Sequence, residues 1–365
     1  MNRLALFGLT ALTISAFAED EIAAGAKSSS MKSSEMQQQQ PSINSLTTAA
    51  PKSDHGWYLF ADALYWHASE GNTDWAFKYA DEPAAIAAGP VHHLDFKWDW
   101  GFRVGIGMSN MQHDQWDSNF YYTWFHAHNS NSIGMTGAPE QVIDTWGSAS
   151  SNFNSAEIDW NVHFSMFDWE LGRNFFVSKN LALRPHIGIK GGWIHQPVKI
   201  SYSGGELKQQ AVNWNLHMEN DFWGVGASGG VNTNWTLGNA GAMNQHRFSI
   251  FGDFSGALMY GHFDVDYKDI VSDIAGTPVH GGVALTNLSR NLAVTMLDAV
   301  LGLSWDVGFN QDRCHFAFRL GYEFQYWFRQ NQLVRGVGQG NDIQVSRASD
   351  DLGLQGLTAD FRFDF

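Results

Sequence analysis

Residues 94–108, LDFKWDWGFRVGIGM, alternate between apolar side chains and polar or small ones at every step. Eight apolar residues occupy the even positions from Leu94 to Met108, and the odd positions hold only aspartate, lysine, arginine and glycine. A period of two places all the apolar side chains on one face of a β-strand and fits no helix. Since an ordinary strand has about 5–6 residues, the run predicts a strand of unusual length.

The same alternation recurs from residue 56 to the last residue. We expect ten strands, at 56–66, 94–108, 116–126, 158–166 with its continuation, 181–194, 222–235, 247–262, 292–309, 314–328 and 351–365. In the fourth of these, the apolar residues change from even to odd positions after Met166. This change of phase predicts a β-bulge near Met166 and Phe167.

The connectors between these strands alternate in length. Short ones fall near 109–115, 174–180, 236–246 and 310–313, and long ones fall at 67–93, 129–156, 199–221, 263–291 and 329–350. A soluble β-sandwich has shorter strands and no such rhythm. We therefore predict an all-β fold over 56–365, a transmembrane antiparallel β-barrel of about 10 strands with long extracellular loops and short periplasmic turns. If a long loop holds another hairpin, the count becomes about twelve.

The composition of the two faces predicts which one meets lipid. Trp and Tyr gather near strand ends on the apolar face, as in the aromatic girdles of membrane barrels, at Trp57, Tyr65, Trp116, Trp124, Trp160, Trp193, Trp235, Tyr260 and Trp305. The opposite face mixes charged residues with many glycines, which would make a poor soluble core. We therefore expect the apolar face to point outward to lipid and the polar face to line the lumen.

The last residues form an amphipathic segment that ends in phenylalanine. Phe361, Phe363 and Phe365 alternate with Arg362 and Asp364. Such a strand resembles the signal read by the outer-membrane barrel assembly machinery. We therefore expect this machinery and outer-membrane lipid as partners, and the bacterial outer membrane as the location.

The first 55 residues differ from the rest of the chain. Residues 1–18 carry one positive charge at Arg3, then an apolar stretch, and end in Ala16-Phe17-Ala18, which predicts a secretory signal peptide. Residues 19–55 are rich in Ser and Gln and poor in large apolar residues, so we expect a disordered periplasmic leader.

Charge and motifs exclude several functional classes. The 37 acids exceed the 22 bases, for a net charge of −15, which argues against a nucleic-acid partner. The single cysteine, Cys314, excludes an internal disulfide framework, and we expect no metal and no cofactor. Since no HExxH occurs and no catalytic motif accompanies the scattered histidines, we expect no catalytic residues and no enzyme activity.

Five segments of the chain resemble a known family: GWYLFADALYW, LDFKWDWGFRVGIGM, LRPHIGIKGGWIHQ, FGDFSGALMYG and GLQGLTADFRFDF. They are similar to the pore-forming major outer membrane proteins of the Legionella type, which also occur among chlamydia-like bacteria. The resemblance covers 56–365 and implies a channel-forming barrel with porin activity, and a homo-oligomer. The disulfide-forming cysteines of that family are missing apart from Cys314, so a crosslinked lattice is not expected.

The inward face predicts a charged pore wall. We expect the pore to be lined by Asp95, Lys97, Asp99, Arg103, Arg184, Lys190, Asp253, Asp298, Arg319, Glu323, Asp360 and Arg362. Acids outnumber bases on this face, and rings of acids favour cations, so a weak cation preference follows. A salt-bridge ladder that fills a narrow barrel fits the same charges equally well.

We therefore expect an outer-membrane porin-like channel that lets small hydrophilic solutes diffuse passively. The alternative is a structural envelope protein or surface adhesin with a closed lumen. The aromatic- and Asn-rich loop at 129–156 suits that alternative.

Overall fold

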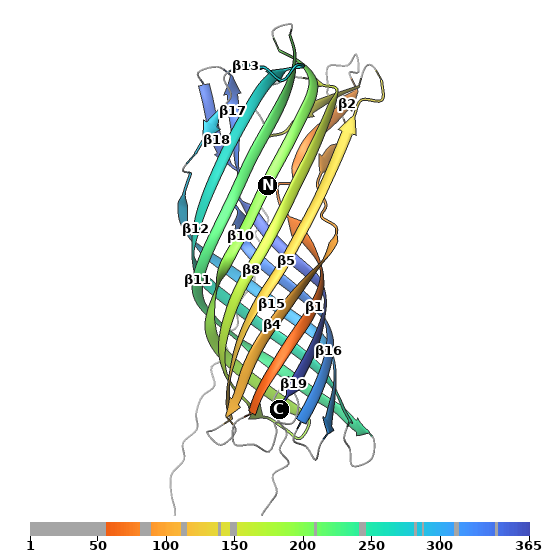
Figure 1. Ribbon diagram of the computed structural model, residues 1–365, viewed down its shortest axis with the longest axis vertical. Helices are drawn as coiled ribbons and strands as arrows, with labels where there is room; N and C mark the ends of the chain where they lie inside the picture. Colours follow the sequence, from red (N-terminus) through yellow and green to blue (C-terminus); the bar gives the residue numbers. More distant parts are fainter. Residues whose placement is uncertain are drawn as a thin grey trace, which may run out of the picture. The chain divides into compact units, whose positions relative to one another are not determined.

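Ten long strands pair with their neighbours in the chain and close on themselves, because the last strand pairs with the first (Figure 1). The computed structural model describes residues 56–80, 89–110, 115–137, 140–146, 152–207, 210–240, 246–280, 283–286, 288–309, 314–339 and 342–365. The signal peptide expected at 1–18 and the leader expected at 19–55 lie outside these residues. No helix among the described residues is long and apolar enough to cross a membrane.

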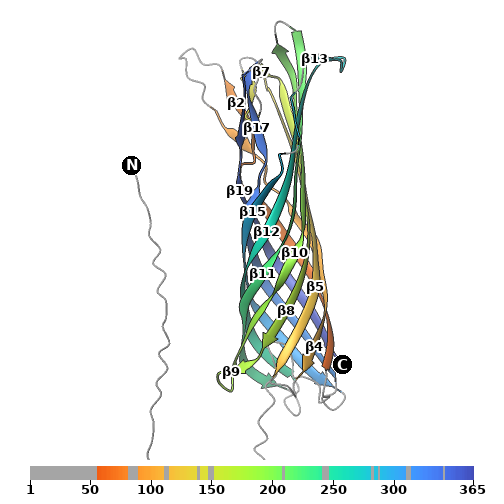
Figure 2. The ribbon, with the colours of Figure 1, turned by 90° about the vertical axis from the view of Figure 1, so that its left-hand side faces the viewer.

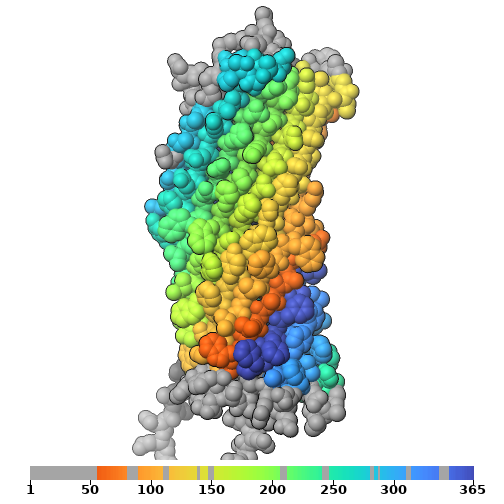
Figure 3. All heavy atoms as spheres, viewed as in Figure 1, coloured from red at the N-terminus to blue at the C-terminus, as the bar shows by residue number. Residues whose placement is uncertain are grey.

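The predicted barrel of ten antiparallel strands is confirmed. Its strands are β1 (Gly56–Glu70), β4 (Trp98–Asn110), β5 (Trp116–Gly134), β8 (Ser155–Arg173), β10 (Leu181–Leu207), β11 (Gln210–Ala240), β12 (His246–Asp273), β15 (Arg290–Phe309), β16 (Cys314–Asn331) and β19 (Asp350–Asp364). At the seam, β1 and β19 pair from Tyr58 opposite Asp364 to Glu70 opposite Leu352. Figure 3 shows the first and last strands side by side on the outer surface.

Most of the short strands occupy the connections at the end opposite to the C-terminus, whereas β9 lies at the same end as the C-terminus (Figures 1 and 2). One four-stranded sheet has the order β3-β2-β6-β7, and β17 and β18 form a hairpin. The bounds of the short strands are β2 (Asp74–Ala80), β3 (Val91–His93), β6 (Glu140–Asp144), β7 (Asn152–Phe153), β9 (Phe175–Phe176), β13 (Pro278–His280), β14 (Ala284–Leu285), β17 (Val334–Gln339) and β18 (Asp342–Arg347).

Three strands are much longer than the alternation of outward apolar residues predicts. β10, β11 and β12 contain 27, 31 and 28 residues. At about 3.3 Å per residue and a tilt of about 40°, the longest rises roughly 80 Å, far above an apolar band of about 25 Å. The long connector expected at 199–221 is therefore wrong, since β10 and β11 pair from Tyr202 and Trp214 downward.

The outward face changes character along each long strand, as β8 illustrates. Phe167 and Trp169 point outward and are exposed, whereas Trp160, Phe164 and Met166 are buried inside the barrel. β8 pairs with β5 without a register shift, so the bulge expected near Met166 and Phe167 is wrong. The apolar residues change position because the strand leaves lipid and enters water, where its apolar face turns inward. The same reason corrects the lipid-facing position expected for Trp160.

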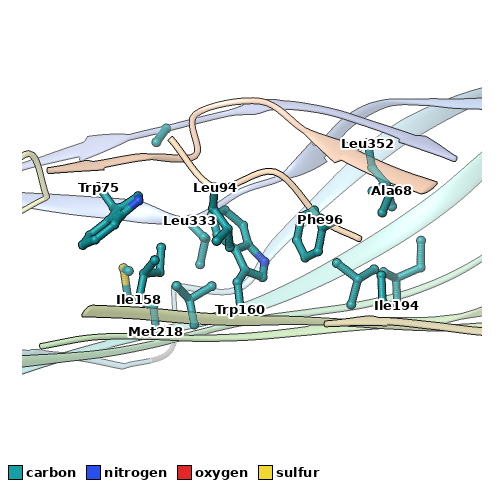
Figure 4. Close-up of a cluster of buried hydrophobic side chains, with 14 of the residues drawn as sticks. Ala68, Trp75, Leu94, Phe96, Ile158, Trp160, Ile194, Met218, Leu333 and Leu352 are labelled. Atoms are coloured by element: carbon teal, nitrogen blue, oxygen red, sulfur yellow. The ribbon is translucent and has the colours of Figure 1, made fainter. Parts of the chain in front are cut away.

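The extracellular half of the lumen is filled by an apolar core (Figure 4). Trp160 points from its strand towards Leu94 and Leu333, which come from connections folded over the barrel. The ring centroids of Phe164 on β8 and Trp327 on β16 lie 5.6 Å apart. Because four strands separate β8 from β16 in either direction, this contact joins opposite walls of the barrel.

We predict that Trp327→Ala destabilises the folded barrel by about 3–5 kcal/mol, because it removes a fully buried side chain and leaves a cavity. The matched control is Phe324→Ala, three positions away on the outward face. It leaves no internal cavity, so it is expected to lower the free energy of unfolding by only about 1–3 kcal/mol, the transfer free energy of the removed side chain. Urea unfolding of refolded protein in detergent measures both values. Equal losses for the two variants would contradict a packed core in the lumen.

A second prediction concerns the sheet that holds β2 and β6. The side-chain and backbone groups of Thr136 donate hydrogen bonds to Glu140, and these bonds with nearby Lys78 lower the pKa of Glu140 to about 2. A lowered pKa stabilises the sheet above about pH 4.3 and loses its effect as the pH falls through about 2. We expect Thr136→Val to raise the pKa of Glu140, as measured by NMR titration. An unchanged midpoint would show that the bond from the Thr136 hydroxyl is not a cause of the lowered pKa.

Candidate functional site: the charged section of the lumen

Below the apolar core, the inward positions carry charged side chains. On β16, Arg319, Gly321 and Glu323 point inward, while Leu320 and Tyr322 are exposed on the lipid side. The strand pairs place similar inward charges on β1, β4, β10, β12 and β19 at neighbouring heights. We call this region the charged section.

Arg103 joins three strands in the charged section. Its guanidinium donates to Asp62 at 2.9 Å and to Glu323 at 2.6 Å. Glu323, whose side chain is 1% exposed, also accepts hydrogen bonds from Thr358 at 2.7 Å and Gln325 at 2.9 Å. Arg103 on β4 and Glu323 on β16 therefore meet across the β1–β19 seam, with all these groups away from water.

A second cluster surrounds Arg184 on β10. Its guanidinium lies 2.5 Å from Asp117 and 3.2 Å from Glu170. Glu170 also accepts a hydrogen bond from the Tyr121 hydroxyl at 2.8 Å, and Arg184 donates to the Asn232 side chain at 2.7 Å. Each charge is thus satisfied by charged or polar neighbours, which a buried ion requires.

The remaining bases of the charged section are paired in the same way. The Lys190 ammonium lies 2.5 Å from Asp168, and the Arg362 guanidinium donates to Asp364 at 2.6 Å. Arg319 pairs with Asp360. A wall built from such pairs offers little free charge to a passing solute.

The space left between these groups is small. Two cavities of about 130 and 80 Å³ lie in the charged section. Ligand pockets usually measure about 300–1,000 Å³, so neither cavity holds a substrate of that size. Asp62 and Asp360 are direct cross-strand neighbours, and one carboxylate oxygen of each has no hydrogen-bond partner. The arginines therefore do not supply a hydrogen bond to every carboxylate oxygen of the charged section.

Most of the predicted pore-lining residues lie in the lumen. The structure places there Arg103, Arg184, Lys190, Asp253, Asp298, Arg319, Glu323, Asp360 and Arg362. Asp99 lies near the end of β4 and accepts a backbone hydrogen bond from His128 at 3.3 Å. These residues come together because they share the inward parity of their strands.

The positions expected for Asp95 and Lys97 are wrong. Both are exposed, because β4 begins only at Trp98 and the preceding segment turns Leu94 and Phe96 into the apolar core. The outer face expected for Leu94 and Phe96 is corrected by the same observation. The even positions are apolar both in 94–97 and in β4. The apolar side chains of 94–97 point into the lumen, whereas those of β4 point outward.

Sequence reasoning missed the tyrosines of the charged section. Tyr121 donates to Glu170, and the Arg362 guanidinium lies 3.4 Å from the centre of the Tyr58 ring. Their inward parity was the available signal, but an aromatic residue in a membrane barrel was expected to face lipid. Among the described residues, no group of three or more His, Cys, Asp or Glu side chains is arranged to hold a metal ion.

We predict that Arg103→Met destabilises the barrel by about 3–5 kcal/mol, because it leaves Asp62 and Glu323 buried without their cation. Lys199→Met, at an exposed outward position, is the matched control and is expected to stay within about 0.5 kcal/mol of the wild type. Urea unfolding in detergent checks both. A similar small effect of the two substitutions would show that Arg103 is not a structural cation.

The comparison with known families agrees with a barrel of the outer membrane. The family described as Legionella pneumophila major outer membrane protein precursor matches residues 49–365. A search of the curated proteins finds no match. Among solved structures, the outer membrane protease OmpT from Escherichia coli is 8% identical with a TM-score of 0.31, over 85% of this chain and 96% of that one.

Two further solved structures are similarly distant. The translocator domain of the autotransporter NalP from Neisseria meningitidis is 10% identical with a TM-score of 0.33, over 86% of this chain and 90% of that one. A FadL homologue from Pseudomonas aeruginosa is 8% identical with a TM-score of 0.23, over the same shares. Such low scores carry no argument, so the fold rests on its own strand pairing. The match to the whole barrel shows that the chain belongs to the Legionella major outer membrane protein family and resides in the bacterial outer membrane.

Proposed function

We propose that this protein is a structural barrel of the outer membrane with a closed lumen, which presents a tall polar body to the outside of the cell. The observation that carries the proposal is the contact between opposite walls, where Phe164 and Trp327 lie 5.6 Å apart between ring centroids. Phe222 on β11 packs against the same Trp327 at 6.5 Å, so three strands meet at one indole. A solute cannot pass this point without displacing a buried aromatic side chain.

The charged section supports the same conclusion. Arg103 reaches Glu323 from the far side of the seam, and both side chains are largely buried. Breaking such a pair without replacing its partners costs several kcal/mol. Two successive barriers, one apolar and one ionic, therefore stand in the path of a solute.

The outward surface above the apolar band fits a role at the cell surface. On β11 and β12 it carries Glu219, His217, Asp266 and Lys268, and apolar side chains there point inward. This distribution is typical of a part in water, and it extends the rigid barrel far from the lipid. The proposal assigns no reaction to the protein.

A second function, a channel for small hydrophilic solutes with a weak cation preference, is favoured by one observation. The larger cavity is lined by six acids and four arginines. An excess of acids in a lumen favours cations. This function requires the apolar core to open, so the conformation described here is then the closed state of the channel.

We predict that refolded wild-type protein gives no stepwise conductance in a planar bilayer, because both barriers are intact. The double variant Phe164→Ala with Trp327→Ala is expected to weaken the apolar barrier, and Phe324→Ala on the lipid face serves as its control. Regular steps from the wild-type protein would overturn the closed-lumen proposal in favour of the channel. If such steps reverse at a potential that indicates anion preference in a KCl gradient, the argument from the acids fails as well.

A further inference from the structure

An open groove lies on the outer surface of β10, β11 and β12, at the height where their outward residues change from apolar to polar. It has a volume of about 450 Å³, and its outward side chains are Trp193, His195, Asp221, Trp223, His262 and Asp264. The strand register aligns them in two rows. Trp193, Trp223 and His262 are cross-strand neighbours, as are His195, Asp221 and Asp264 one step further from the lipid.

The groove combines exposed indoles with polar groups in the way that a sugar requires. Trp193 and Trp223 are 56% and 44% exposed, so each indole keeps apolar surface that can cover an apolar face of a sugar ring. His195 pairs with Asp221, and the Asp221 side chain remains 51% exposed. Carboxylates accept hydrogen bonds, and an imidazole both donates and accepts, so this row matches the hydroxyl groups of a carbohydrate.

A row of bases lies above the groove on the same three strands. Lys199, His217 and Lys268 are cross-strand neighbours and point outward. They follow the row of His195 by four residues, which is about 13 Å along a strand. Burial lowers the pKa of His217, and the charges of Lys199 and Lys268 lower it further, so both ammonium groups act on the same place.

Glu219 and Asp266 lie between the two rows. They add hydrogen-bond acceptors for hydroxyl groups and separate the aromatic row from the bases. An anion is therefore favoured only at the upper row. The arrangement fits a headgroup longer than one sugar ring, neutral next to the lipid and anionic at its outer end.

The aromatic residues on another part of the girdle are arranged differently. On β1 and β4, Tyr65 lies 5.5 Å from Trp98 and 4.8 Å from Trp100 between ring centroids. These rings cover one another, as side chains that only anchor the barrel in the interface do. In the groove, Trp193 meets Phe167 edge to face at 6.0 Å and Trp223 lies 6.1 Å from Tyr260, but these indoles also have acids and imidazoles beside them.

From this geometry we propose that the groove binds the phosphorylated oligosaccharide headgroup of a glycolipid in the outer leaflet. Its first sugar packs on Trp193 and Trp223, its hydroxyl groups bond to Asp221 and Asp264, and a phosphate lies between Lys199 and Lys268. The acyl chains then lie along the apolar outward face of β10 and β11. The site is on the outside of the barrel and is independent of whether the lumen opens.

The test is native mass spectrometry of refolded protein in detergent, titrated with rough lipopolysaccharide, with its enzymatically dephosphorylated form, and with phosphatidylglycerol. We expect the wild-type protein to retain rough lipopolysaccharide at least tenfold better than phosphatidylglycerol. Lys199→Ala with Lys268→Ala should reduce this retention about tenfold and leave that of the dephosphorylated form unchanged. Trp193→Ala with Trp223→Ala should reduce both.

Trp100→Ala, an exposed girdle position away from the groove, is the matched control and should retain the wild-type preference. Heat-modified mobility in gel electrophoresis establishes that each variant is folded. Equal retention of rough lipopolysaccharide and phosphatidylglycerol by the wild-type protein would overturn the proposal. So would equal losses in the groove variants and in Trp100→Ala.

Discussion

Every backbone N–H and C=O group inside a membrane must be bonded within the protein, since lipid offers no partner. In this chain that constraint is met by pairing the last strand with the first, from Tyr58 to Glu70 of β1. Closure fixes which side chains point inward. A barrel of about eight strands has a lumen that side chains fill, and the diameter grows with the number of strands. A barrel of ten strands is only slightly wider, so large side chains can still fill its interior. The packed lumen of this protein follows from its strand number together with its large inward residues, such as Trp160 and Trp327.

A single long strand in this barrel passes through lipid at one end and through water at the other. On β8, the apolar residues face outward at Phe167 and Trp169, and they face inward from Met166 upward. The hydrophobic effect drives both arrangements, because in each case the apolar side chains leave water. The ion pairs of the charged section lie at the level where the outer face meets lipid, and the apolar core lies where it meets water. The protein is thus a membrane barrel below and resembles a soluble barrel above.

Strand number and chain direction could be predicted from the sequence, because a period of two is visible without knowing which face is buried. The orientation of 94–97 and 158–166 could not be predicted. A period of two shows that one face of a strand is apolar, but it does not show whether that face points into the lumen or outward. The members of the charged section could largely be predicted from parity, as for Arg103 and Glu323. Their pairing could not, since two residues 220 positions apart meet only once the register across β1 and β19 is fixed.

The pair formed by Arg103 and Glu323 has a mechanical consequence. β4 and β16 flank the two strands whose edges close the cylinder, and the ion pair ties them together from within. Pulling the edges apart sideways would have to separate these charges in a medium of low dielectric constant before any backbone bond is gained elsewhere. The resistance of the β1–β19 seam to separation therefore depends in part on the Arg103–Glu323 ion pair, whose two residues lie on the neighbouring strands β4 and β16.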